Sequence, residues 1–308
     1  MRRSLVLIGG SILLASAVIT GCHKGSGGNG PQNALHTVFT NNLAAAEQSF
    51  FVDALAGGTI TGSDGTQVTF IANAFRTQGG GAVSGQVTVK LVEALTVGKM
   101  LLINKQTVGY DNGVMKPLTS GGQFRLTASQ NGQPLKLVPG GSFVLVPANN
   151  PDPQMELFSG TVDADGTILW DPFAQGQLNA DSMGYTFPND SLGWINCDYF
   201  MNWGVPLTTI TVTVPTNHND QNTFVWTVFP SINSLTNAPQ YDANASTFAT
   251  GPNYSAPIGE NVIIVSLALI NGVYYSSFTP TTLVANHNEV ISYQATTLAQ
   301  FNADCMAL

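Results

Sequence analysis

The stretch NVIIVSLALINGVYYSSF, residues 261–278, decides the fold class of this chain. Residues 261–270 are its longest apolar strand candidate, and residues 273–278 form a second candidate directly after it. Asn271-Gly272 separates the two runs. An Asn-Gly pair in that place indicates a hairpin, because both central residues of a type I′ turn need a positive φ. The stretch therefore predicts two antiparallel strands joined by a two-residue turn.

Similar patterns recur along most of the chain. Asn131-Gly132 and Asp165-Gly166 also stand between strand candidates and predict hairpin turns. Runs that alternate with period two, or that are continuously apolar, predict further strands at residues 66–72, 86–92, 123–129, 134–138, 142–146, 155–162, 167–170, 209–215, 223–230 and 289–294. Many short strands joined by tight turns are typical of β-sandwiches. The sequence predicts an all-β protein with two tandem antiparallel β-sandwich domains.

The boundary between the two domains is expected where the strand pattern stops. Residues 171–183 begin with DPFAQGQLNADS, which lacks periodicity and contains Pro, Gly and Asn, so they are interpreted as a linker. The first sandwich is then expected at residues 50–170 and the second at residues 184–308. Residues 298–308 place Leu298, Phe301, Cys305 and Leu308 on one side of a short closing helix. A helical turn or two is expected within residues 34–48.

The N-terminus carries the pattern of an export signal. Arg2 and Arg3 precede an apolar segment that is too short to span a bilayer, which needs roughly 20 apolar residues. Ile19-Thr-Gly-Cys22 resembles the lipobox of bacterial lipoproteins, in which the cysteine sulfur is acylated and the chain is cut just before it. Residues 1–21 are thus expected to be a signal peptide. Residues 22–49 are expected to be a lipid anchor and flexible tether, with Cys22 as the lipidation site.

The expected location follows from this anchor. Cys22 would attach the chain to a membrane, and the residue after it is not the Asp that in similar lipoproteins favours retention in the inner membrane. We therefore expect a cell-envelope protein, most consistent with the outer membrane. The sequence leaves open whether the folded part faces the periplasm or the cell surface. An ordinary secretory signal with a chance cysteine is the alternative.

Charge is scarce and unevenly distributed. Charged residues make up 9% of the chain, against a typical ~25%, while the hydrophobic share is an ordinary 44%. Residues 137–308 contain no Lys or Arg but thirteen Asp or Glu. A region without cations cannot neutralise phosphates, which argues against nucleic-acid binding. The same carboxylates must be solvated, hydrogen-bonded or bound to a metal, since their own half of the chain offers no cationic partner.

Three stretches resemble a family of uncharacterised bacterial lipoproteins: GQVTVKLVEALTVGKMLL at residues 85–102, MKPLTSGGQFRLTASQNGQPLKLVPGGSFVLVPANNPDPQMELFSGTV at residues 115–162, and LGWINCDYF at residues 192–200. The first domain is also similar to the β-sandwich module of ankyrins, netrin receptors and zonula occludens scaffolds. That resemblance implies protein–protein contact without catalysis. Tyr199 stands where the family pattern has a basic residue, which puts any role of charge at that position in doubt.

No motif in the sequence assembles a catalytic or metal site. The four histidines, His23, His36, His218 and His287, form no H-x-H or H-E-x-x-H pair, and no serine lies in G-x-S-x-G. His218 and His287 are expected in loops. Asp163, Asp165 and Asp171 form the nearest group of carboxylates, but turn and strand-exit roles explain them better than glycoside hydrolysis or calcium binding. We therefore predict no catalytic, cofactor or metal residues and no cofactor.

Cysteines and aromatic residues leave two structural questions open. Cys197 and Cys305 form either a disulfide, which export permits, or buried free thiols. Trp226 alternates with apolar neighbours and is expected in the core, whereas Trp194 and Trp203 could lie in the core or on a surface that binds glycans.

Three functions are compatible with the sequence. The preferred one is a non-enzymatic envelope lipoprotein whose sandwiches bind an envelope protein or have a structural role. The second is a polysaccharide-binding accessory lipoprotein, which requires exposed tryptophans on a flat sheet face. The third is an exported hydrolase, which requires a cleft that brings His218 or His287 together with carboxylates.

Overall fold

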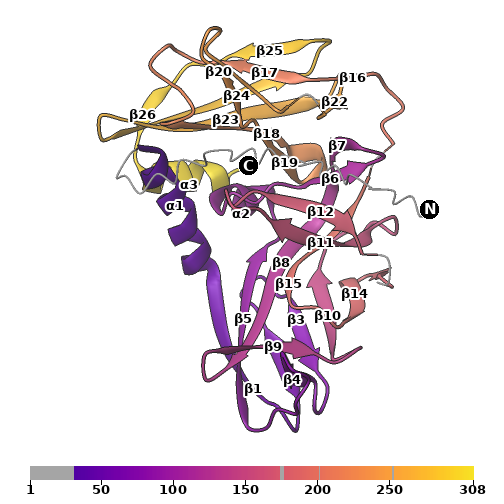
Figure 1. Cartoon of the computed structure of the whole chain (residues 1–308). Helices are drawn as coiled ribbons and strands as arrows, with labels where there is room; N and C mark the ends of the chain where they lie inside the picture. The colour runs from indigo at the N-terminus through magenta and orange to yellow at the C-terminus, as the bar shows by residue number, and fades with distance from the viewer. Residues whose placement is uncertain (1–30, 174–176, 201, 252) are drawn as a thin grey trace, which may run out of the picture.

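The computed structural model describes residues 31–173, 177–200, 202–251 and 253–308, and its architecture is mainly β. Strands contain 52% of the residues and helices 11%, which confirms the predicted all-β class. The strands form several sheets that gather at two ends of the molecule (Figure 1). We call the sheets at the lower end of Figure 1 the N-terminal sheets and those at the upper end the C-terminal sheets.

Two sheets form the N-terminal part. The order in the larger one is β1 (Glu47–Asp53), β5 (Gln86–Ala94), β8 (Thr119–Gln130), β15 (Gly193–Tyr199), β11 (Glu156–Val162), β12 (Ile168–Pro172), β6 (Val108–Asp111) and β7 (Val114–Pro117), with β9 (Gln133–Leu137) beside β8 and β4 (Phe75–Thr77) beside β9. The order in the smaller one is β13 (Asn179–Asp181), β14 (Gly184–Asn189), β10 (Ser142–Pro147), β3 (Gln67–Phe70) and β2 (Gly58–Thr61).

Three sheets form the C-terminal part. The first pairs β16 (Leu207–Thr208) with β22 (Ala256–Pro257), and the second has the order β20 (Gln240–Asp242), β21 (Thr247–Ala249), β17 (Ile210–Thr213) and β25 (His287–Val290). The third has the order β19 (Ser234–Asn237), β18 (Thr223–Phe229), β23 (Asn261–Ile270), β24 (Val273–Thr282) and β26 (Gln294–Thr296), and a 3₁₀ turn, η1 (Pro230–Ile232), precedes β19.

The predicted hairpins are confirmed. Ile270 pairs with Val273 across Asn271-Gly272, and Gln130 pairs with Gln133 across Asn131-Gly132. All four turn residues have a positive φ, as a type I′ turn requires. Two pairings, β6 with β12 and β17 with β25, are parallel, and the others are antiparallel. The strand expected at residues 289–294 is divided between β25 and β26.

The chain leaves the N-terminal sheets later than the sequence predicted. The expected linker at 171–183 contains the end of β12 and all of β13, and β14 and β15 pair with N-terminal strands although they lie beyond it. The physical reason is packing, because β15 inserts between β8 and β11 and brings Ile195 and Cys197 into the core of those sheets. The structure therefore differs from the predicted division at residues 171–183.

Three helices lie between the two sets of sheets: α1 (Pro31–Ala46), α2 (Val97–Leu102) and α3 (Leu298–Met306) (Figure 1). The closing helix is confirmed as α3, with Phe301 and Cys305 fully buried. The prediction of a flexible tether at 22–49 is wrong for its described part. That part forms α1 and the start of β1, and Leu35 is fully buried. None of the helices in the described ranges is long and apolar enough to span a bilayer.

The apolar core has three parts. One lies between the two N-terminal sheets and another between the second and third C-terminal sheets. The third joins both halves of the molecule, because it contains Leu35 and Phe39 of α1, Trp170 of an N-terminal strand and Trp226 of a C-terminal strand. Burial of apolar surface at this seam is worth roughly 25 cal/mol per Å². The two sets of sheets are therefore packed against each other and not merely tethered.

Candidate functional site

The most distinctive polar feature lies at the seam between the two sets of sheets. Residues 104–107, Asn-Lys-Gln-Thr, connect α2 to β6, and we call them the junction segment. All four residues are buried, at 7% exposure or less. Asn104 adopts a φ of 51°, which turns the chain after α2. Because burial of a polar group is costly unless it is hydrogen-bonded, the partners of these side chains define the seam.

The junction segment binds the C-terminal sheets through both of its ends. The Trp226 indole nitrogen donates to Asn104 Oδ1 at 2.9 Å. The Thr107 hydroxyl lies 2.6 Å from the Ser234 hydroxyl and accepts a hydrogen bond from the Leu235 N–H at 2.9 Å. In return, the Thr107 N–H donates to the Leu235 carbonyl at 2.9 Å. One backbone bond and one side-chain bond therefore attach β19 to the junction segment.

The middle of the segment binds the N-terminal sheets. Lys105 Nζ donates to the Gly166 carbonyl at 2.7 Å, and Gln106 Nε2 donates to the Ile168 carbonyl at 3.0 Å. The Trp170 indole nitrogen donates to the Gln106 carbonyl at 2.7 Å. These bonds fix the β11–β12 hairpin against the segment.

Two asparagines of the C-terminal part complete the seam. The Asn237 N–H donates to Gln106 Oε1 at 3.1 Å, so this glutamine bonds both sets of sheets at once. Asn233 Nδ2 donates to the Leu95 and Ser120 carbonyls, at 3.0 and 3.1 Å. If the two sets of sheets moved relative to each other, several buried hydrogen bonds would break together. Each broken bond would leave a buried donor or acceptor without a partner.

A cleft opens beside the junction segment. It consists of two cavities of about 420 and 430 Å³ that share His36, Asn104 and Asp165 in their walls. One wall is α1, the second is the turn of the β11–β12 hairpin, and the third is the start of β18. Ligand sites commonly occupy clefts of this size at the contact of two structural units.

The charges of the cleft are mixed. Burial lowers the pKa of the Lys105 ammonium to about 8, helped by Arg125 and opposed by Asp163. Burial also lowers the pKa of His36, with Asp165 opposing that effect. The Lys105 ammonium donates to a backbone carbonyl and forms no ion pair with a carboxylate of the described residues. The cleft thus combines one amine that titrates near neutral pH with exposed carboxylates at its rim.

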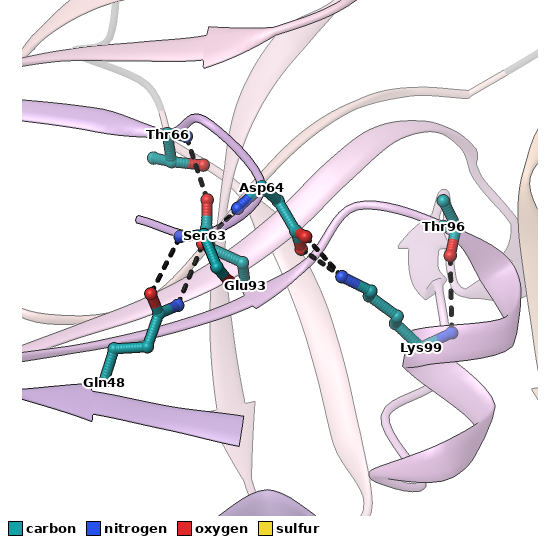
Figure 2. Close-up of polar contacts among 7 residues, drawn as sticks. All are labelled: Gln48, Ser63, Asp64, Thr66, Glu93, Thr96 and Lys99. Carbon is teal, nitrogen blue, oxygen red and sulfur yellow. Dashed lines mark hydrogen bonds and ion pairs between the residues drawn. The ribbon is translucent and has the colours of Figure 1, made fainter. Parts of the chain in front are cut away.

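A second polar site, the Glu93 loop, lies within the N-terminal sheets (Figure 2). We use this name for residues 62–66 together with the Glu93 carboxylate that they surround. Glu93 Oε2 accepts from the Asp64 N–H at 3.0 Å and from Gln48 Nε2 at 2.9 Å, and Glu93 Oε1 accepts from the Thr66 N–H at 2.9 Å. A Cβ atom on Gly62 would lie 2.2 Å from this carboxylate, which only glycine avoids.

The Glu93 carboxylate satisfies backbone N–H groups of this loop. Burial alone would raise the pKa of Glu93, but hydrogen bonds from Asp64, Gln48 and Thr66 outweigh it and hold the pKa below its usual value. Next to the loop, Lys99 of α2 forms an ion pair with both Asp64 oxygens (Figure 2). The site therefore closes a local turn of the fold and binds α2 to it.

The histidines singled out in the sequence are both buried; His218 lies in a loop, between β17 and β18, as expected, whereas His287 lies in a strand. His218 is 4% exposed, stacks on Tyr293 at 3.9 Å and bonds the Asn217 side chain through Nδ1. His287 is also 4% exposed and begins β25, where its Nδ1 accepts from the Val284 N–H at 3.3 Å. Glu289 lies 3.6 Å from the other ring nitrogen of His287. Burial lowers the pKa of both histidines, so each is neutral at pH 7.

The predicted carboxylate group has a turn role. Asp163 Oδ1 accepts from the Asp165 and Thr167 N–H groups, at 3.0 and 2.9 Å, and this shapes the β11–β12 hairpin. Asp171 lies near the end of β12. Within the described ranges, no three His, Cys, Asp or Glu side chains come together in a way that could hold a metal ion.

Cys197 and Cys305 are free thiols. Cys197 lies in the core between the N-terminal sheets, while Cys305 lies in the core at the seam, and both are fully buried. Burial raises the pKa of each thiol well above its usual value. Both cysteines are therefore uncharged packing residues, and the disulfide alternative is not realised.

The tryptophans separate into two kinds. Trp226 is fully buried, as predicted, and Trp194 is only 7% exposed, so neither offers a ring to a flat sheet surface. Trp203 is half-buried and borders a cavity. Of the two alternatives for these residues, burial in the core therefore applies to Trp194, and Trp203 stays open to a surface role.

Sequence reasoning did not find the buried carboxyl of Asp198. It lies on β15 next to Cys197, is fully buried, and accepts a hydrogen bond from Asn196. Burial raises the pKa of Asp198 well above its usual value, because a carboxyl without solvent favours its uncharged form. Only the unusual polarity of the stretch NCD at residues 196–198 could have indicated it.

The predicted lipidation site, Cys22, lies outside the described residues. A scan of the sequence against models of known protein families and a search of curated proteins both give no match. The functional inference therefore depends on the chemistry of the chain itself.

Proposed function

We propose that the protein is a non-enzymatic, lipid-anchored component of the bacterial cell envelope that presents a rigid β scaffold to another envelope protein. The observation that carries the proposal is the junction segment, whose buried hydrogen bonds join both sets of sheets. A scaffold that positions a binding surface benefits from such rigidity. The lipobox-like sequence before Cys22 supports the anchor, and outer-membrane attachment is part of the proposal.

The burial of the two candidate bases, His218 and His287, supports a non-catalytic role. His218 and His287 are both 4% exposed, and the Nδ1 atom of each is hydrogen-bonded to a protein group, while the Nε2 atom of each is closed off from solvent. A general base must reach the proton that it abstracts from a bound substrate. Neither histidine borders the junction cleft, so the proposal assigns no base to that cleft.

The junction cleft is the surface that we assign to the partner. Its walls come from α1, the β11–β12 turn and the start of β18, so only the assembled scaffold creates it. Asp165 and Asp220 are exposed at its rim, and residues 137–308 offer them no Lys or Arg. These carboxylates complement a basic patch on a partner protein.

Two measurements on cells that produce the protein test the proposal. Membrane fractionation should recover the wild-type protein with the outer membrane and release the Cys22→Ala variant, with His23→Ala as the matched control. A photo-reactive amino acid at Asp165 or Asp220 should cross-link to one envelope protein, whereas the same group at Leu55, exposed at 54% away from the cleft, should not.

Accessibility to protease then decides orientation. The enzyme must have broad specificity, because trypsin finds no Lys or Arg after Lys136. Membrane attachment that persists in Cys22→Ala would contradict the anchor. Equal cross-linking from Leu55 and from the cleft would contradict the assigned surface.

A further inference from the structure

A separate cavity of about 360 Å³ lies where the chain passes from β15 to β16. One side contains Phe200, Asn202 and Trp203, and the other side is the β6–β7 hairpin, with Asp111 and Lys116. We call it the Trp203 cavity. It lies apart from the junction cleft, and none of its lining residues lines that cleft.

The aromatic wall of this cavity is held in place from behind. Trp203 packs against the core of the C-terminal sheets, and Phe200 meets Phe158 edge-on with ring centroids 5.5 Å apart. The other three tryptophans of the chain, Trp170, Trp194 and Trp226, are buried. Trp203 is therefore the one tryptophan that can present part of its ring to a ligand from solvent.

The polar wall is an ion pair with unused hydrogen-bonding capacity. Lys116 Nζ lies 2.6 Å from Asp111 Oδ2, and Asn112 Nδ2 donates to Asp111 Oδ1 at 2.8 Å. The Lys116 and Asp111 side chains retain 25% and 31% of their exposure. An ammonium has three donor hydrogens and each carboxylate oxygen two acceptor positions, so both groups can also bind hydroxyls.

The net charge of the cavity selects its ligand. One Asp and one Lys cancel, so neither an anion nor a cation gains from entering. A sugar ring is neutral, has an apolar face that packs on an aromatic ring, and carries hydroxyls that both donate and accept. Val205 and Leu207, exposed at 45% and 40%, add apolar surface beside the polar groups.

We propose that the Trp203 cavity binds one sugar unit of a neutral polysaccharide. The ring face of the sugar packs on Trp203, and two of its hydroxyls bond to Asp111 and Lys116. The volume, near the lower end of known ligand pockets, suits a single ring with its neighbours in the chain extending outward. This binding activity goes beyond the proposed scaffold role and depends neither on the lipid anchor nor on the junction cleft.

Titration of the full-length protein in detergent tests the proposal. The ligands are neutral gluco-, manno-, galacto- and N-acetylglucosamine oligosaccharides, and the signal is tryptophan fluorescence, to which Trp203 is the exposed contributor. Calorimetry on the same samples measures affinity independently. At least one oligosaccharide should bind with a saturable change, and Trp203→Leu and Asp111→Asn should each weaken it roughly tenfold or more.

Two further variants distinguish binding from misfolding. Trp203→Phe keeps an aromatic ring and should retain binding in calorimetry while losing the fluorescence change. Phe51→Leu removes an aromatic side chain that is 66% exposed on β1, and it should bind like the wild type. Near-ultraviolet circular dichroism checks that each variant is folded.

Three results would overturn the proposal. The first is the absence of binding for every neutral oligosaccharide at millimolar concentration. The second is unchanged affinity in a folded Trp203→Leu or Asp111→Asn protein. The third is preferential binding of uronate oligosaccharides or of lysine oligomers, which would show that the cavity selects charge.

Discussion

The junction segment and the Glu93 loop solve the same problem in opposite ways. Both are irregular stretches whose polar groups cannot be satisfied by regular strand pairing alone. In the Glu93 loop, a carboxylate from a neighbouring strand reaches in and accepts the backbone N–H groups of Asp64 and Thr66. In the junction segment, side chains reach out to the backbones of two sets of sheets, as Gln106 does with Ile168 and Asn237. The first arrangement closes a local turn, and the second joins distant parts of the molecule.

The two lysines near α2 show the electrostatic side of this difference. Lys99 pairs with the Asp64 carboxylate beside the Glu93 loop, and its side chain remains 31% exposed. Lys105 is 7% exposed and bonds only a carbonyl, and burial lowers its pKa to about 8. An ion pair near the surface favours the charged form of both groups. Burial of an amine without a carboxylate partner favours its neutral form, so its protonation changes at a lower pH.

Gln106→Leu should have the largest effect on stability. The variant leaves the Ile168 carbonyl and the Asn237 N–H without their partner in a buried seam, which costs about 3 kcal/mol of unfolding free energy. Urea unfolding measures the loss. Gln133→Leu, at an exposed position of β9, is the matched control and should change little. A loss below about 1 kcal/mol in Gln106→Leu would contradict the role of the junction segment.

Lys105→Met should remove a pH-dependent change in the unfolding free energy that is about as large as the loss in Gln106→Leu. The pKa of Lys105 falls from 10.5 to about 8 on folding, so between these values the unfolded chain binds more protons and stability rises with pH. The rise amounts to at most about 3 kcal/mol and should be absent in Lys105→Met. Unfolding curves from pH 7 to pH 10 measure it. Lys136→Met, at an exposed position, should retain the rise of the wild type.

Glu93→Gln should destabilise the protein by about 2 kcal/mol at pH 7, because hydrogen bonds to a charged acceptor are lost. The folded pKa of Glu93 lies below its usual 4.5. Its contribution is therefore complete above pH 4.5 and is lost as the pH falls through the lowered folded value. The difference in unfolding free energy between wild type and variant should decrease at pH 3. Glu156→Gln, at an exposed position of β11, should cause no difference at either pH.

Lys99→Met should have the smallest effect of the four. The Lys99–Asp64 pair is partly exposed, and such pairs contribute about 0–1 kcal/mol. The loss should decrease further at high salt, which screens exposed charges. Thermal unfolding at low and high ionic strength measures it. A loss equal to that of Gln106→Leu would mean that both regions stabilise the fold in the same way.

The local elements were predictable because their signals are local. Period-two alternation and the Asn-Gly pairs at 131–132 and 271–272 indicated the strands and hairpins that the structure contains. The apolar side of α3 was predictable for the same reason, since Phe301 and Cys305 lie one helical turn apart. Burial of Trp226 followed from its alternation with apolar neighbours.

The long-range features were not predictable, because nothing nearby in sequence encodes them. Insertion of β15 between β8 and β11 moves the end of the N-terminal sheets past the predicted linker at 171–183. The sequence Asn-Lys-Gln-Thr at 104–107 has no periodicity, and the hydrogen-bond partners of its side chains lie more than 60 residues away. Helix α1 is held in place because its Leu35 and Phe39 pack in the core at the seam. Each of these depends on pairing or packing that exists only in the folded chain.

Hydrogen exchange by mass spectrometry on the full-length protein tests the central claim most directly. The claim is that the junction segment makes both sets of sheets one unit. The account predicts that the central amides of β8 and β23 exchange through one opening of equal free energy. It also predicts that Gln106→Leu lowers that free energy equally for both strands. Different opening free energies for β8 and β23 in the wild type, or a loss confined to one strand in the variant, would contradict it.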